Sequence, residues 1–125
     1  MTPFASRATP TMRKVVVALA ITAALTPLAA EGKVARCIIR QNGAVAYSGA
    51  CRFLSEQDGS FSIRRHDAKP ILPSITDISV SIISTGRADV RGLTTHGNNS
   101  RWGAAVRSRN DPACWTGSDF EICAY

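Results

Sequence analysis

Residues 34–55 have the sequence VARCIIRQNGAVAYSGACRFLS, and this stretch decides the fold class. Apolar and polar side chains alternate over residues 34–40, which is the pattern of a strand with one buried face. Asn42-Gly43 follows, a pair that accepts the positive φ angles of a tight hairpin turn. The chain is then expected to return over residues 44–47, to turn again at Ser48-Gly49, and to form another strand over residues 50–55. The stretch therefore predicts antiparallel β structure.

The rest of the chain repeats this pattern without an internal repeat. Further strands are expected at residues 60–65, 75–84, 87–91, 104–109, 113–115 and 120–124, with turn residues between them. Residues 92–102 are rich in Gly, Asn, Thr and Ser and are expected to be irregular. No helical periodicity follows residue 30. We predict an all-β fold, a small antiparallel sandwich or barrel of about seven to eight short strands.

The N-terminal segment resembles an export signal. Arg13 and Lys14 precede an apolar run over residues 15–25, and small residues follow Thr26-Pro27 up to Ala30. The run is shorter than the roughly 20 residues that a membrane-spanning helix needs. The competing interpretation, a buried N-terminal helix, lacks a second helix to pack against. We predict a signal peptide over residues 1–30, with Met12 as an alternative start, no transmembrane anchor after cleavage, and one domain over residues 31–125.

Removal of that segment changes the charge. The whole chain carries +6, but residues 1–30 hold three basic and no acidic side chains, so 15 − 3 = 12 basic against 9 acidic residues leave +3. Most of the arginines alternate with apolar residues, as on the solvent side of a sheet. Nucleic-acid binding favours clustered basic residues with exposed aromatics, so no nucleic-acid partner is predicted. A polyanionic envelope surface stays open as a partner.

The four cysteines lie downstream of the predicted signal, where an exported protein keeps thiols as disulfides. Four cysteines allow three pairings. The favoured pairing joins Cys37 to Cys51, because both have inward parity. It also joins Cys114 to Cys123, because they flank a short hairpin. The alternative pairs Cys37 with Cys123 and Cys51 with Cys114. Zinc-ligand spacing is absent, so neither a metal site nor a cofactor is predicted.

Three short motifs carry a resemblance. They are Tyr47-Ser-Gly-Ala-Cys-Arg-Phe53, Asp58-Gly-Ser-Phe-Ser-Ile63, and Ala113-Cys-Trp115 with Ile122-Cys-Ala-Tyr125. With them the chain resembles a group of small exported proteins from alphaproteobacteria. These share a Gly-x-Cys-x-Phe strand, a Gly-Ser-Phe-x-Ile strand, and a terminal Ala-Cys-Trp with Ile-Cys-Ala-aromatic. The resemblance implies a secreted, disulfide-stapled β domain and implies no activity; residues 96–102 depart from its pattern.

The sequence contains few of the residue patterns that catalysis by a hydrolase requires. His66 and His96 are the two histidines, and each lies in a polar, loop-like setting. No Gly-x-Ser-x-Gly motif accompanies them, and His66 and Asp67 would point to opposite faces of a strand. A small hydrolase using His66 or His96 is therefore an alternative rather than the expectation.

The region before Trp102 is the candidate binding site. His96, Asn98, Asn99, Arg101 and Trp102 combine amide, arginine and aromatic groups of the kind that carry affinity at recognition surfaces. The competing interpretation is that Trp102 caps the end of the β structure and the asparagines turn the chain.

We expect a periplasmic or secreted, non-enzymatic binding or inhibitor module whose partner is an envelope protein or a polyanionic surface. The alternatives are a structural envelope component, which would self-associate through an unprotected edge strand, and the small hydrolase. The sequence specifies no ligand, oligomeric state or pathway.

Overall fold

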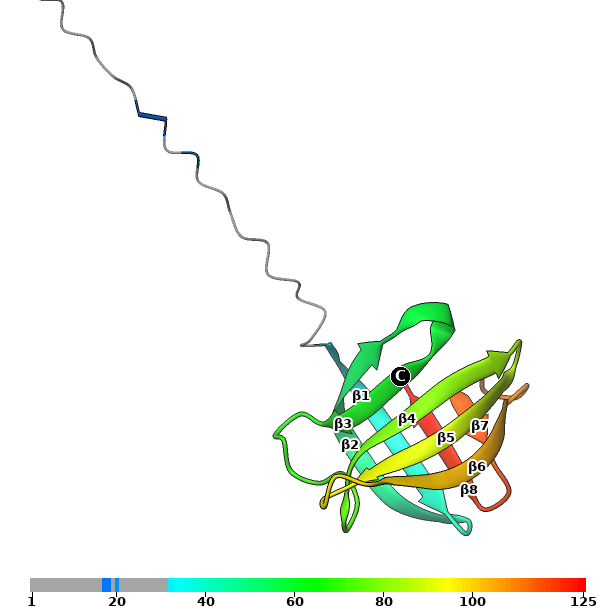
Figure 1. Ribbon diagram of the computed structural model, residues 1–125. Coiled ribbons are helices and arrows are strands. Elements are labelled where there is room, and N and C mark those ends of the chain that lie inside the picture. The colour runs from blue at the N-terminus through cyan, green and yellow to red at the C-terminus, as the bar shows by residue number, and fades with distance from the viewer. Residues whose placement is uncertain (1–16, 19, 21–31) are drawn as a thin grey trace, which may run out of the picture.

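Eight antiparallel strands form the wall of a closed barrel (Figure 1). The computed structural model describes residues 17, 18, 20 and 32–125, so the predicted signal peptide, residues 1–30, lies almost wholly outside the described residues. The strands are β1 (Lys33–Gln41), β2 (Ala44–Ser55), β3 (Phe61–Arg65), β4 (Ile75–Ser84), β5 (Arg87–Thr94), β6 (Asn99–Arg107), β7 (Cys114–Thr116) and β8 (Phe120–Ala124). A short 3-10 turn, Gln57–Gly59, connects β2 to β3.

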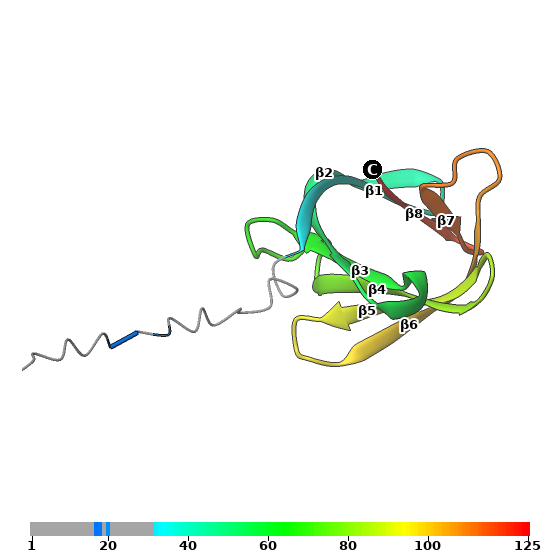
Figure 2. The same ribbon diagram turned by 90° about the horizontal axis from the view of Figure 1, so that it is seen from above.

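The barrel closes because β1 pairs on both of its edges. It pairs with β2 over its whole length and with β8 from Cys37↔Ala124 to Gln41↔Phe120. Every other strand pairs with its neighbours in the sequence, which gives an up-and-down order. Figure 2 shows a flattened ring, with β1, β2 and β8 on one side and β3 to β6 on the other. The all-β prediction is confirmed, and of the two architectures expected the protein adopts the barrel.

Strand alternation fills the interior with branched apolar side chains. Each strand turns every second residue inward, so the apolar positions of the alternating pattern meet along the barrel axis. Six of these side chains are wholly shielded from solvent: Ile39, Ile63, Ile78, Val80, Val90 and Ile122. The middle of the barrel is therefore packed core, with no channel through it.

Two disulfides fasten the wall. Cys37 is bonded to Cys51 across β1 and β2, and Cys114 is bonded to Cys123 across β7 and β8. Cys114 and Cys123 are direct partners in the ladder. The local pairing is confirmed, and it leaves no free cysteine.

Two predicted interruptions are wrong. No turn occurs at Ser48-Gly49, because Gly49 pairs with Cys37 inside a continuous β2. Residues 92–102 are also mostly extended, since β5 continues to Thr94 and β6 begins at Asn99. In both places a glycine makes room for an aromatic ring: the hydroxyl of Tyr47 lies close to Gly49, and the indole of Trp102 lies close to Gly92. Residue types that are common in turns therefore occur here inside strands, at positions where an aromatic side chain packs closely against the backbone.

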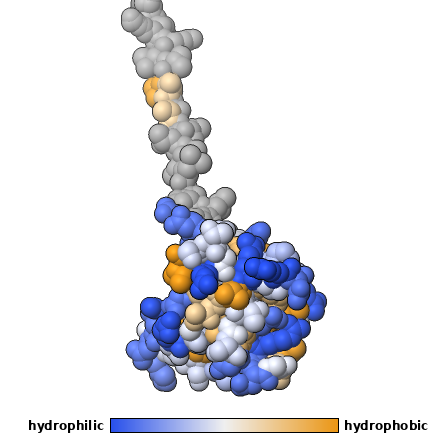
Figure 3. Space-filling view, turned by 90° about the vertical axis from the view of Figure 1, so that its right-hand side faces the viewer, coloured by the Kyte–Doolittle hydropathy of each residue, from blue (hydrophilic) through white to orange (hydrophobic). Residues whose placement is uncertain are grey.

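The outer surface is mainly polar. On the face in Figure 3, hydrophilic residues separate a few hydrophobic ones. Along the described part of the chain, no helix has the length and apolar character to cross a membrane.

Candidate functional site

The two ends of the barrel differ. One end carries the β1–β2 and β5–β6 turns and the β3–β4 connection, and there Ile71 and Leu72 fold into the core with exposures of 3% and 5%. A backbone bridge between Leu72 and Ile75 holds that connection against the strands. The other end carries the start of β1, the β4–β5 turn and the β6–β7 loop. The first is hereafter the closed end, and the second is the open end.

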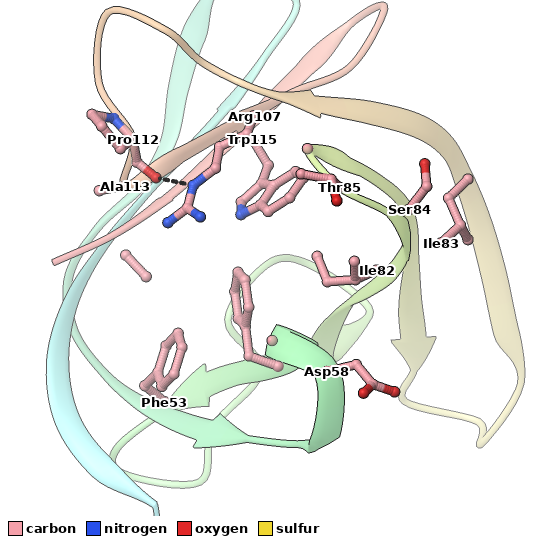
Figure 4. Close-up of a pocket in the computed structure, with 14 residues that line it drawn as sticks. Phe53, Asp58, Ile82, Ile83, Ser84, Thr85, Arg107, Pro112, Ala113 and Trp115 are labelled. Atoms are coloured by element: carbon pink, nitrogen blue, oxygen red, sulfur yellow. Dashed lines mark hydrogen bonds between the residues drawn. The ribbon is translucent and has the colours of Figure 1, made fainter.

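A cavity of about 560 Å³ lies at the open end. We call it the mouth pocket, defined by Phe53, Phe61, Ile82, Arg107, Trp115 and Ala124 among the residues that line it. In Figure 4, Arg107 and Trp115 lie on one side of the space, Phe53 lies opposite them, and Ile82 borders the space on the right. The rings of Phe53 and Phe61 are stacked with centroids 4.7 Å apart. The walls are thus largely aromatic and aliphatic, which is typical of small-ligand pockets.

Arg107 brings a positive charge to this apolar pocket. It is the last residue of β6 and has the inward parity of Ala105, and its side chain is exposed at the rim of the pocket. Its Nε–H donates to the carbonyl oxygen of Pro112 at 2.7 Å, and its guanidinium lies 5.6 Å from the centroid of the Trp115 ring. The hydrogen bond and the cation–π contact hold the guanidinium in one orientation.

The β6–β7 loop that supplies Pro112 is itself braced. The Ser108 hydroxyl oxygen accepts hydrogen bonds from the backbone N–H groups of Asn110 and Asp111, both at 3.2 Å. The Tyr125 hydroxyl donates to the carboxylate of Asp111. That hydrogen bond, with desolvation and the negative charge of Asp111, raises the pKa of Tyr125. The carbonyl that orients Arg107 therefore sits on a loop with its own internal support.

The predicted binding residues lie at the closed end, and four of the five are exposed there. His96 and Asn98 are exposed in the β5–β6 turn, where the Asn98 N–H donates to Thr94 Oγ1 at 3.0 Å, and Asn99 begins β6. Arg101 is exposed on the outer wall, where it pairs with Asp89 at 2.8 Å.

Trp102 turns away from these residues. It is half buried, it meets Phe120 edge-on with ring centroids 5.5 Å apart, and it covers Gly92. This placement favours the interpretation that Trp102 caps the closed end. The predicted region could hold a ligand in a small surface hollow of about 240 Å³, which lies beside Trp102 and Arg101.

The histidines stand apart from catalytic partners. Both His66 and His96 are exposed. Among the residues that the structure describes, neither makes a hydrogen bond to a serine or a carboxylate, the geometry that a hydrolase triad requires.

One cluster has the residue types of a metal site. The side chains of Cys114, Glu121 and Cys123 place their ligand atoms within 4.8 Å of one another. The two sulfur atoms are joined in a disulfide, so neither is the thiolate that a metal ion binds. In this oxidised state the cluster is structural.

The mouth pocket was not predicted from the sequence, although a signal for it exists. Alternation over Gly103, Ala105 and Arg107 puts Arg107 on the inner face of β6, next to two small residues. A charged residue at an inward position near the end of a strand marks a barrel mouth. The comparisons with known proteins add nothing to this site, since no family model, curated protein or solved structure matches the chain.

Proposed function

We propose that this domain is an exported, non-enzymatic binding or inhibitor module of the cell envelope, and that the open end of its barrel is the binding surface. The observation that carries the proposal is the asymmetry of the barrel: Ile71 and Leu72 seal one end, while the other holds the mouth pocket. Eight-stranded barrels of this size are filled by side chains or hold one small group. This barrel is filled in its middle and hollow at one end.

The cysteines support the proposed compartment. Two disulfides and no free thiol indicate an oxidising environment. Together with the charged and apolar N-terminal segment, they support export to the periplasm or the exterior. The resemblance to small exported alphaproteobacterial proteins points the same way and stays a prediction.

The two tryptophans give a direct test, because they lie at opposite ends. Trp115 lines the mouth pocket and Trp102 caps the closed end. The neutral aromatic probe N-phenyl-1-naphthylamine would be titrated into the domain while the two indole N–H resonances are followed by NMR. We expect the Trp115 resonance to move and the Trp102 resonance to stay. Movement of Trp102 alone, or of neither, would contradict the proposal.

A pair of variants tests the same site independently. Ala124 lines the mouth pocket and is half buried, whereas Ala46 is exposed on β2. Ala124→Trp should abolish saturable probe binding by filling the pocket, and Ala46→Trp should leave it unchanged. Near-ultraviolet circular dichroism would check that both variants are folded.

A structural envelope role keeps one supporting observation. β6 pairs with β7 only through Val106 and Arg107, so within the described residues positions 99–105 have no strand partner on that edge. Such an edge is where self-association would occur. Light scattering distinguishes the roles: a monomer at high concentration favours the binding module, and a concentration-dependent polymer favours the structural component.

A further inference from the structure

We infer that the mouth pocket selects a small aromatic anion, with the Arg107 guanidinium as the partner of its negative charge. This inference rests on the proposed function, because it takes the mouth pocket to be the binding site and assigns its ligand chemistry. Three features carry it: the free donors of Arg107, the absence of a competing carboxylate, and the shallow depth of the pocket.

Arg107 has unused hydrogen-bonding capacity that faces the pocket. A guanidinium has five N–H donors. Nε–H is bonded to Pro112, and within the described residues the four Nη–H donors have no hydrogen-bond or ion-pair partner. Figure 4 shows the guanidinium directed toward the space above Phe53. Pro112 and Trp115 already hold the guanidinium in one orientation. Binding of an anion would therefore cost little conformational entropy of the Arg107 side chain.

Among the described residues, no acidic side chain forms an ion pair with Arg107. Asp58 is the one carboxylate among the residues that line the pocket, and in Figure 4 it points away from the space between Phe53 and Arg107. The four ion pairs recorded for the described residues all involve other arginines. The pocket therefore presents a positive charge to an incoming ligand, and because Arg107 is exposed, solvent screens part of its attraction for an anion.

The depth of the pocket limits the apolar part of the ligand. Directly beneath it lie core side chains with no exposure to solvent, among them Ile39, Ile63 and Ile122. A long acyl chain cannot pass along the barrel axis through this layer. The Phe53 ring, which is half buried and backed by the stacked Phe61 ring, instead offers a flat surface to a planar group, whereas Phe61 and Trp115 are themselves only 5% exposed. Shape and charge together specify an aromatic carboxylate, sulfonate or similar monoanion.

A charged and a neutral probe with similar aromatic groups distinguish two claims: that the mouth pocket binds a ligand, and that this ligand is an anion. The anion 1-anilinonaphthalene-8-sulfonate and its uncharged relative N-phenyl-1-naphthylamine would be titrated by fluorescence into the folded domain. Arg107→Gln should weaken sulfonate binding by about tenfold or more, as expected for loss of a charge-assisted hydrogen bond, and should change binding of the neutral probe less than about twofold. The matched control is Arg109→Gln, which removes the same charge from an exposed residue that does not line the pocket, and both affinities should stay unchanged.

The outcomes are distinguishable. If both probes bind at the mouth and Arg107→Gln weakens neither, or weakens both equally, the assignment of an anionic ligand is overturned while the mouth pocket stands as a binding site. Equal weakening by Arg109→Gln would overturn it as well, because the effect would then come from net charge. If neither probe binds, or both bind without moving the Trp115 indole resonance, the proposed function fails and the ligand assignment fails with it.

Discussion

The disulfide between Cys37 and Cys51 should be a main contributor to the stability of the barrel. Replacing both residues by alanine releases a loop whose ends are 14 residues apart. The chain-entropy model assigns such a loop about 3 kcal/mol. Both cysteines have no exposure to solvent, so the loss of buried sulfur adds to that cost. A small domain has a total stability of about 5–15 kcal/mol, and we therefore expect the variant to fold with a strongly reduced free energy of unfolding.

Urea unfolding at pH 7, followed by tryptophan fluorescence, measures the loss. The paired control is the alanine double variant of Cys114 and Cys123, whose separation of nine residues corresponds to about 2.7 kcal/mol on the same model. The two variants should thus be destabilised by similar amounts. A cost below about 1 kcal/mol for the Cys37–Cys51 pair would refute the reasoning, because it would mean that the disulfide does not restrict the unfolded chain as the model requires.

Three further predictions concern the wall and the open-end loop. Gly92→Ala should destabilise the domain by about 1–3 kcal/mol, because its new Cβ would lie 2.9 Å from Trp102 Nε1, and thermal denaturation should show a smaller loss in a Trp102→Phe background. Asp89→Asn removes the carboxylate shared by two exposed arginines, and should cost no more than about 1 kcal/mol in urea unfolding, with the difference shrinking as salt is added. The raised pKa of Tyr125 means that the folded state favours the protonated phenol, so this contribution to stability is complete below about pH 10 and is lost as the pH rises through the raised value. In a spectrophotometric titration Asp111→Asn should bring that pKa back toward its ordinary value, and an unchanged pKa would contradict the assigned hydrogen bond.

Local patterns predicted the strands well because period-two alternation is a local property. Residues 75–84 and 120–124 form β4 and β8 with the expected bounds. Closure of the wall is different in kind, because β1 and β8 meet across most of the domain. Alternation specifies which face of each strand is buried, and a sandwich and a barrel bury the same faces. The choice between them depends on this long-range pairing, which the pattern does not contain.

The prediction of a functional region depended on composition, and composition is ambiguous for Trp102. A tryptophan near Asn and Arg residues occurs in recognition loops, but it also packs over a glycine on the next strand, as Trp102 does over Gly92. Arg107 was not predicted to be a binding residue, because in the sequence it lies beside Arg109 and resembles the other surface arginines. Its distinction is its inward parity at a strand end. That this strand end belongs to the open end of the barrel becomes visible only in the pairing of β6 with β7, where Arg107 lies opposite Trp115.

A closed barrel restricts where recognition can occur. Because β1 and β8 pair, most backbone groups of the wall are used. Within the described residues, unpaired strand edges lie along β6 before Val106 and along β2 before Cys51. The closed end is filled by Ile71 and Leu72, and its surface hollow beside Trp102, of about 240 Å³, has less than half the volume of the mouth pocket, about 560 Å³. At the open end the cavity is already present between aromatic side chains. The hydrogen bond to the Pro112 carbonyl already orients Arg107 at the edge of this cavity. A preformed site loses less free energy to ordering when it binds, which makes the open end the part of this molecule best suited to recognition.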